Sequence, residues 1–182
     1  MYFDKIGESN TLETLRLAHA RAKELEINEV VIASTTGKTA FQAYEIFKDF
    51  QITIVTYHCG FRAPFESVMP VETRKSLEDK GMQVVLATHA LSGVERSIAK
   101  KYQGIYPVLL IADVLRLFGQ GTKVAVEISI MAADAGTLTG KDIVSIGGSG
   151  KGADAALILK PANQSDLFDI RIREIVCKPR TF

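Results

Sequence analysis

Residues 30–40 read Val-Val-Ile-Ala-Ser-Thr-Thr-Gly-Lys-Thr-Ala, and the order of element types within this stretch decides the fold. An apolar run typical of a buried strand stops at hydroxyl, glycine and lysine positions, and a helical pattern begins directly after them. The first turn of a helix has backbone N–H groups without intrahelical partners, and the helix dipole adds partial positive charge there. The stretch therefore predicts an anion site, most plausibly for a phosphate.

The spacing of this loop differs from that of the loop that binds nucleoside triphosphates. That motif requires a second glycine five residues before Gly37, and the position is taken by Ile32, inside the strand. We therefore expect one terminal phosphate rather than a triphosphate. The alternative is an ordinary turn in which Ser34 or Thr36 caps the helix and no ligand binds. The residues expected to hold the phosphate are Ser34, Thr35, Thr36, Gly37, Lys38 and Thr39.

Length and composition restrict the class of protein. A chain of 182 residues, 47% of them hydrophobic, predicts a single domain over residues 1–182. The formal net charge is +1, from 22 basic and 21 acidic residues, which argues against nucleic acid as a partner. The apolar runs are too short for a membrane span, so no membrane partner is expected. With only Cys59 and Cys177, we expect no disulfide framework and a cytoplasmic location.

Helical and strand patterns alternate along the chain. The apolar spacing predicts helices over residues 12–25 (capped by Asn10 or Thr11), 38–50, 72–80 and 104–118. It predicts strands over residues 29–33, 52–56, 84–87, 142–146, 155–159 and 169–176, the last as an edge or antiparallel strand. Such alternation indicates an α/β architecture with a mainly parallel sheet.

Two apolar segments allow more than one interpretation. Residues 108–113 imitate a strand that ends in a magnesium-binding aspartate, but the apolar residues continue at helical spacing, so we expect a helix without magnesium. Residues 123–136 fit both an alternating strand and a helix face that ends at Gly136, and period alone does not decide between them.

Residues that follow parallel strands point into the crevice where open α/β sheets bind ligands. Tyr57 and His58 follow the second strand, and Thr88 and His89 follow the third. Tyr57 or Phe61 is suited to stacking on a flat ring, although an aromatic side chain at such a place also serves as ordinary core. From residues 91–97, the groups expected to add ligand contacts are Ser92, Gly93 and Arg96.

A second glycine-rich loop spans residues 147–152. Gly148, Gly150 and Ala153 match the dinucleotide fingerprint formally, but a short apolar strand follows them instead of the required helix, so that interpretation fails. Either the loop donates backbone N–H groups to an anion through Gly147, Gly148 and Gly150, or it is a surface turn.

The pattern offers little support for a metal or for a covalent nucleophile. His58, Cys59 and His89 form the only cluster of potential ligands, and neighbouring residues on a strand end point in opposite directions. We therefore expect no metal site. No serine lies in the strand-to-helix elbow that hydrolases use.

The order of these motifs resembles the C-terminal α/β domain of pyruvate kinase, in which a serine/threonine/glycine loop holds a phosphate of a sugar bisphosphate. The chain is more similar to the stand-alone proteins with that fold from archaea and some bacteria. The segments that carry this resemblance are residues 56–61, 91–97 and 130–136, and it extends from about Asn10 to Pro179.

The resemblance implies a three-layer α/β/α sandwich with a mostly parallel, five-stranded sheet, and it implies that residues 124–135 are helical. It also implies a phosphate-bearing ligand, for which flavin mononucleotide (FMN) is the first candidate. No segment matches the catalytic barrel of pyruvate kinase, so pyruvate kinase activity is not expected, and fold alone supplies no reaction.

Three functions remain open at this point. The leading hypothesis is a binding protein, with a possible homo-oligomeric state, for a phosphorylated small molecule. The second is an enzyme that acts on a phosphorylated metabolite with His58 or His89 as general base and Arg96 on the substrate. The third is a ligand-responsive regulatory or assembly module that pairs through exposed helix faces.

Overall fold

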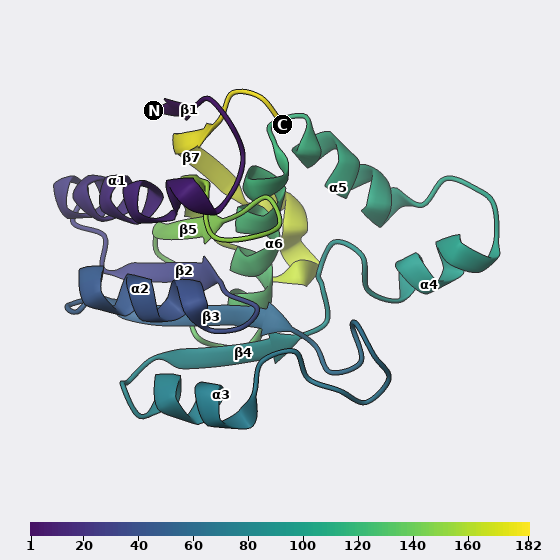
Figure 1. Cartoon of the computed structure of the whole chain (residues 1–182). Helices are drawn as coiled ribbons and strands as arrows, with labels where there is room; N and C mark the ends of the chain where they lie inside the picture. The colour runs from purple at the N-terminus through teal and green to yellow at the C-terminus, as the bar shows by residue number, and fades with distance from the viewer.

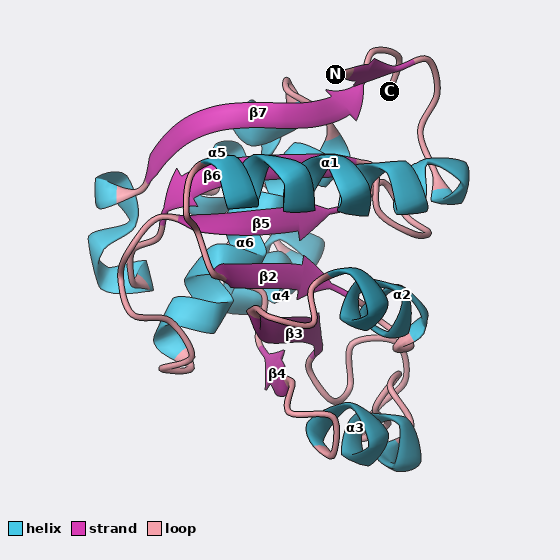
Figure 2. Ribbon diagram, turned by 90° about the vertical axis from the view of Figure 1, so that its left-hand side faces the viewer, coloured by secondary structure: helices cyan, strands magenta, loops and turns pink.

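The computed structural model describes residues 1–182 and contains one seven-stranded sheet with helices on both faces (Figures 1 and 2). The strands are β1 (Tyr2–Phe3), β2 (Glu29–Ala33), β3 (Gln51–Tyr57), β4 (Gln83–Ala87), β5 (Ile143–Gly147), β6 (Ala155–Lys160) and β7 (Arg171–Pro179). The α-helices are α1 (Thr11–Glu24), α2 (Lys38–Ile46), α3 (Val71–Glu78), α4 (Gly93–Lys101), α5 (Pro107–Arg116) and α6 (Gln120–Asp134). Two short 3-10 turns, Glu8–Asn10 and Gln164–Asp169, complete the chain.

The strand order is β1-β7-β6-β5-β2-β3-β4. Strands β5, β2, β3 and β4 run parallel, whereas β6 lies antiparallel to both of its neighbours. Because β2 lies between β5 and β3, the loops that follow these three strands meet at one edge of the sheet.

Alternation along the strands supplies two cores, one on each face of the sheet. Val30 and Ile32 of β2 pack in the core under α1, α2 and α3, whereas Val31 packs in the core under α5 and α6. The two cores make this a three-layer α/β/α arrangement, as the resemblance implied. Helix α6 is buried at 11 of its 15 residues, which explains why its apolar pattern fitted a strand and a helix equally well.

The structure corrects several expectations. The sheet has seven strands instead of the five that the resemblance implied, because β7 extends it beyond β6 and the two-residue β1 pairs with β7. Strand β7 itself was expected from the sequence and is antiparallel to β6. Helix α2 ends at Ile46 instead of residue 50. Asn10 occupies the N-cap position of α1, as expected, but neither it nor Thr11 makes a side-chain cap: the Asn10 amide donates to the Lys5 carbonyl, and the Thr11 hydroxyl donates to the Glu8 carbonyl. Helix α4 was not predicted from its short, charged sequence.

The other expected strands and helices are confirmed, including helical structure for residues 108–113, which lie in α5, and for the ambiguous segment in α6. No helix combines the length and the apolar composition needed to cross a membrane.

The two cysteines differ in exposure, and this difference predicts their reactivity. Cys177 is fully buried on β7, and burial raises the pKa of its thiol to about 11, whereas Cys59 is exposed. Because the thiolate is the reacting species, we expect an aromatic disulfide reagent at neutral pH to modify one thiol per native chain rapidly and the second only after denaturation. Cys59→Ser should abolish the rapid phase. Two rapid thiols in the native wild type would contradict this expectation.

Candidate functional site

A cavity of about 480 Å³ lies at the edge where β2, β3 and β5 end, which is within the range of roughly 300–1,000 Å³ usual for small-molecule sites. Its walls come from the loops after these strands, from the face of α6, and from α4 and α5 on the far side. Of the residues expected from the sequence, the cavity is lined by Ser34, Thr35, Thr36, Lys38, Thr39, Tyr57, His89, Arg96, Gly148 and Gly150.

The loop between β2 and α2 has an unusual number of free donors. None of the five backbone N–H groups from Thr35 to Thr39 donates a hydrogen bond to a protein atom. The loop is nevertheless held in place, because the Ser34 hydroxyl accepts the Ala40 N–H at 3.3 Å and the Thr56 hydroxyl donates to the Thr35 carbonyl at 3.1 Å. The result is a preorganised set of amides at a helix N-terminus, which is a favourable place for an anion.

Gly37 shapes this loop and does not line the cavity. Its φ of +93° is in the left-handed region, and a Cβ at this position would lie 2.5 Å from Cγ2 of Thr73 on α3. Lys38 lines the cavity, where its ammonium group forms an ion pair with Glu8 from the N-terminal segment. Glu8 and Lys38 therefore form a charged rim on one side of the amides.

The glycine-rich loop after β5 lies on the same cavity. Gly148, Gly150, Lys151 and Gly152 line it, and the N–H groups of residues 150–152 donate to no protein atom. Asp154 holds the loop in place, because its buried carboxylate accepts hydrogen bonds from the Gly7 N–H at 3.0 Å and from the Ser149 hydroxyl at 3.2 Å. Burial raises the pKa of Asp154, and these hydrogen bonds oppose the rise.

Gly147 is not part of the lining, although the sequence placed it among the ligand contacts. A Cβ at Gly147 would lie 2.2 Å from the carbonyl oxygen of Gly121 on α6. This glycine therefore allows β5 and α6 to approach closely, which is a packing role.

Aromatic side chains form one wall of the cavity. The rings of Phe61 and His89 stack with their centroids 4.6 Å apart, and the Tyr57 ring lies 4.3 Å from Phe61. The Arg96 guanidinium lies over the Phe61 ring at 5.3 Å. A flat surface with a cation above it is suited to a planar, electron-rich group.

The remaining predicted residues lie outside the cavity lining. His58 lies edge-on to His89 at 5.9 Å, and its Nδ1 is 2.7 Å from the Cys59 carbonyl oxygen. Thr88 lines a separate hollow beside β4. Ser92 is buried at the start of α4, and Gly93 is the first residue of that helix.

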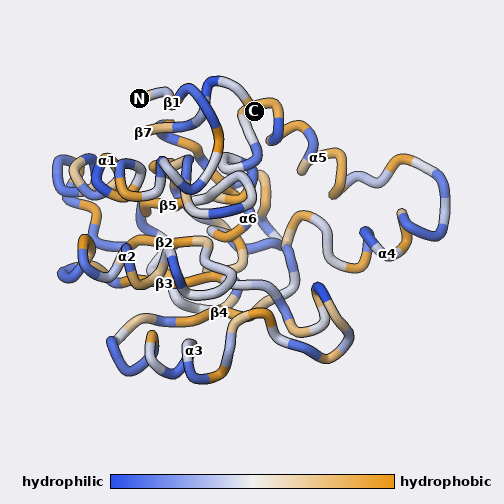
Figure 3. Tube along the Cα trace, viewed as in Figure 1, coloured by the Kyte–Doolittle hydropathy of each residue, from blue (hydrophilic) through white to orange (hydrophobic).

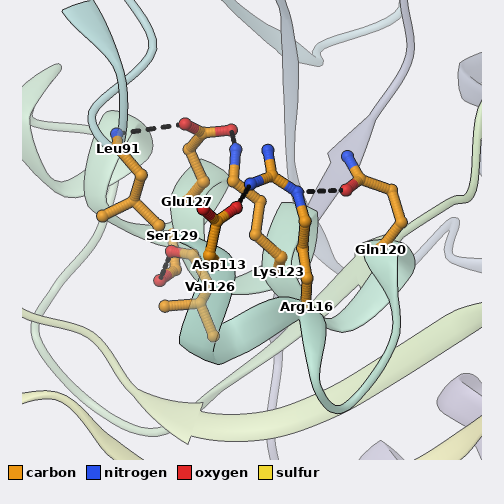
Figure 4. A network of polar contacts seen from close by, with 8 residues as sticks. All are labelled: Leu91, Asp113, Arg116, Gln120, Lys123, Val126, Glu127 and Ser129. Atoms are coloured by element: carbon orange, nitrogen blue, oxygen red, sulfur yellow. Dashed lines mark hydrogen bonds and ion pairs between the residues drawn. The ribbon is translucent and has the colours of Figure 1, made fainter. Parts of the chain in front are cut away.

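Helix α6 supplies a charged pair that the sequence reasoning missed. Lys123 and Glu127 form an ion pair on the cavity wall with each side chain only 3% exposed, and Glu127 also accepts the Leu91 N–H at 3.0 Å (Figure 4). Burial lowers the pKa of Lys123, while Glu127 opposes that effect. The signal in the sequence was a lysine and a glutamate four residues apart within an otherwise apolar helix.

His89 borders this pair and has an unusual environment. Its Nδ1 is buried without a hydrogen-bond partner. Burial lowers the pKa of His89, an effect that Lys123 and Arg96 strengthen and Glu127 opposes. The imidazole is therefore neutral at neutral pH and has one nitrogen without a partner.

The charge of the lining is strongly positive. Two carboxylates, from Glu8 and Glu127, face six cationic side chains. On α5, Arg116 donates to the Gln120 side chain at 2.9 Å and pairs with Asp113, which holds it beside α6 (Figure 4). Low-dielectric walls with an excess of one sign of charge raise the local concentration of the opposite ion. The cations are Lys38, Arg62, Arg96, Arg116, Lys123 and Lys151.

Comparison with protein families agrees with this arrangement. Residues 13–159 match the family model of the pyruvate kinase alpha/beta domain, a span that includes the loop between β2 and α2, the aromatic wall, α6 and the glycine-rich loop. The match covers far more than half of the chain, and it starts and ends within the same three-layer fold. The chain therefore belongs to the pyruvate kinase alpha/beta domain family.

Proposed function

We propose that this protein binds a small molecule that carries a phosphate and a flat ring, with FMN as the first candidate. The observation that carries the proposal is the run of five unpaired amides from Thr35 to Thr39 at the N-terminus of α2, on the wall of a cavity. Amides fixed in this way bind a phosphate without reorganisation, and hydrogen bonds to a charged acceptor are about twice as strong as neutral ones.

The rest of the cavity supports a ligand that extends beyond its phosphate. The aromatic wall of Tyr57, Phe61 and His89 offers a stacking surface for an aromatic ring. The free N–H groups of residues 150–152 and the nearby Lys151 offer polar contacts for a linking chain such as ribityl. The buried Lys123–Glu127 pair presents both a donor and an acceptor, which suits the edge of a flavin ring.

The proposal is tested by titrating the purified protein with FMN and with riboflavin, which has the same ring without the phosphate, and following flavin fluorescence. We expect FMN to bind at least about 100-fold more tightly, because the amides of residues 35–39 act on the phosphate, which riboflavin lacks. Thr36→Val combined with Thr39→Val should weaken FMN binding about 30-fold and leave riboflavin unchanged, since each hydroxyl contributes roughly 1 kcal/mol.

Thr181→Val, at the exposed C-terminus, is the matched control and should bind FMN as the wild type does. Equal affinity for FMN and riboflavin, or no binding of either, would overturn the proposal. Protein that is yellow when purified and releases flavin on heating would support it independently.

A second candidate function rests on His89. Its neutral imidazole, with a buried and unpartnered Nδ1 in a lined cavity, is equipped to act as a general base toward a phosphorylated metabolite, with Arg96 on the substrate. His58 is a weaker candidate because it does not line the cavity. Turnover of a sugar phosphate that His89→Gln abolishes, in protein that does not bind flavin, would favour this function over the first.

A further inference from the structure

Helices α4 and α5 and the segment between them, residues 93–118, form an arm that extends away from the sheet (Figure 1). Helix α5 packs on α6 through Ala112, which is buried, whereas α4 contains no buried residue. The Glu95 carboxylate accepts the Leu109 N–H at 2.8 Å and so joins the two helices of the arm.

The arm has an unusually apolar exposed surface. It provides 8 of the 19 large hydrophobic side chains that the whole chain exposes, within 26 consecutive residues. Figure 3 shows hydrophobic segments along α5 and in the connection from α4. These side chains are between 43% and 86% exposed, and they are Val94, Ile98, Tyr102, Ile105, Leu110, Val114, Leu117 and Phe118.

The spacing of these residues places them in stripes. Val94, Ile98 and Tyr102 are four residues apart along α4 and its end, and Leu110, Val114 and Phe118 repeat the same interval along α5. Residues four apart lie on one face of a helix. Each helix of the arm therefore presents an apolar stripe, and most side chains of the two stripes are about half exposed. We call these two stripes, together with Leu117 beside the second stripe and the connecting Ile105, the arm face.

The size of the arm face matches that of a protein interface. The exposed fractions of its eight side chains correspond to roughly 900 Å², close to the ~800 Å² that each partner contributes to a standard interface. The largest apolar patch on a typical monomer is only about 300–600 Å². A surface of this size is costly to leave in water.

We propose that the arm face is covered by the arm face of a second copy of this chain, in a two-fold symmetric dimer. In an isologous dimer the same patch lies on both sides, so the patch must be complementary to itself. An apolar stripe on each of the two helices can meet this requirement, because two helices from each copy can pack into one four-helix contact. The stripe positions themselves carry no charged residue, and Lys101 and Asp113 border the stripes.

The test is the mass of the protein by sedimentation velocity from low micromolar to several hundred micromolar concentration. We expect the wild type to be a dimer over most of this range. Substitution of Val94, Ile105 and Leu117 by lysine places like charges across the two-fold axis and should raise the dimer Kd at least about 100-fold. These side chains are 75%, 86% and 74% exposed, so the fold does not depend on them.

The matched control carries the same three added charges away from the arm: Phe65→Lys, Val71→Lys and Phe168→Lys, at residues 95%, 74% and 81% exposed. It should remain a dimer. Hydrogen exchange of the wild type at the two ends of the concentration range needs no variant, and it should show protection of residues 93–118 that increases with concentration.

A monomeric wild type at the highest concentration would overturn the proposal and leave the arm face to another partner. A dimer that survives the three lysines would also overturn it, because the contact would then lie elsewhere. Neither result depends on flavin binding, since none of the substituted residues lines the cavity.

Discussion

Glu127→Ala is expected to lower the free energy of unfolding by about 3–5 kcal/mol, more than any other single substitution considered for this chain. The substitution leaves the Lys123 ammonium buried without its partner and removes the acceptor of the Leu91 N–H. A buried charge without a partner carries a desolvation cost that nothing offsets. Chemical denaturation by urea, followed by circular dichroism, measures the loss.

Helix α3 offers the matched control. Arg74 and Glu78 form an ion pair with the same spacing of four residues, but their side chains are 46% and 42% exposed. Glu78→Ala should therefore lower the free energy of unfolding by less than about 1 kcal/mol. If Glu127→Ala lowered the free energy of unfolding no more than Glu78→Ala, burial would not make the Lys123–Glu127 pair more important for stability than an exposed pair.

A double substitution separates what the pair contributes to folding stability from what it contributes to ligand binding. Lys123→Met with Glu127→Leu removes both charges and fills the space, and such replacements are often neutral or stabilising. We expect it to recover most of the stability lost in Glu127→Ala while it weakens FMN binding. That result would assign the two charges to the proposed ligand rather than to the core.

Gly147→Ala has the second-largest expected effect, a loss of about 3 kcal/mol in the free energy of unfolding. The added Cβ would lie 2.2 Å from the Gly121 carbonyl oxygen and 2.7 Å from the Ala125 nitrogen. Both are backbone atoms of α6 and cannot rotate away, so the helix must move from the sheet. Thermal unfolding by calorimetry measures the change.

Gly150→Ala is the control for this prediction. No atom lies within 4 Å of a Cβ at Gly150, so the alanine meets only the backbone cost of a φ of +107°. That cost is about 1 kcal/mol. Equal losses for the two variants would show that close packing between β5 and α6 is not what Gly147 provides.

The sequence was sufficient to predict those strands and loops whose local pattern agrees with their tertiary environment. Strands β2, β3, β4 and β5 are short apolar runs bounded by polar or glycine residues, and the loop from Ser34 to Thr39 was found because its donors are consecutive. Helix α6 remained ambiguous because burial on most sides removes the polar face that distinguishes a helix from a strand.

The part of the site that α6 contributes was not predictable from sequence spacing. Lys123 and Glu127 face a loop some ninety residues earlier only because α6 packs across β2 and β5. Thr88 follows a strand and was expected beside His89, yet successive residues point to opposite sides, and Thr88 lies on a separate hollow. Strand β1 was missed because a two-residue strand leaves no periodicity to detect.

The cavity combines main-chain donors from one loop with side-chain cations from the arm, and the two kinds of group respond differently to substitution. The amides of residues 35–39 belong to the main chain, and most side-chain substitutions leave them in place, whereas Arg96 and Arg116 come from an arm outside the sheet. For the binding proposed above, substitutions of Arg96 and Arg116 would therefore change which ligand fits the cavity, while the main-chain donors for its phosphate would stay in place.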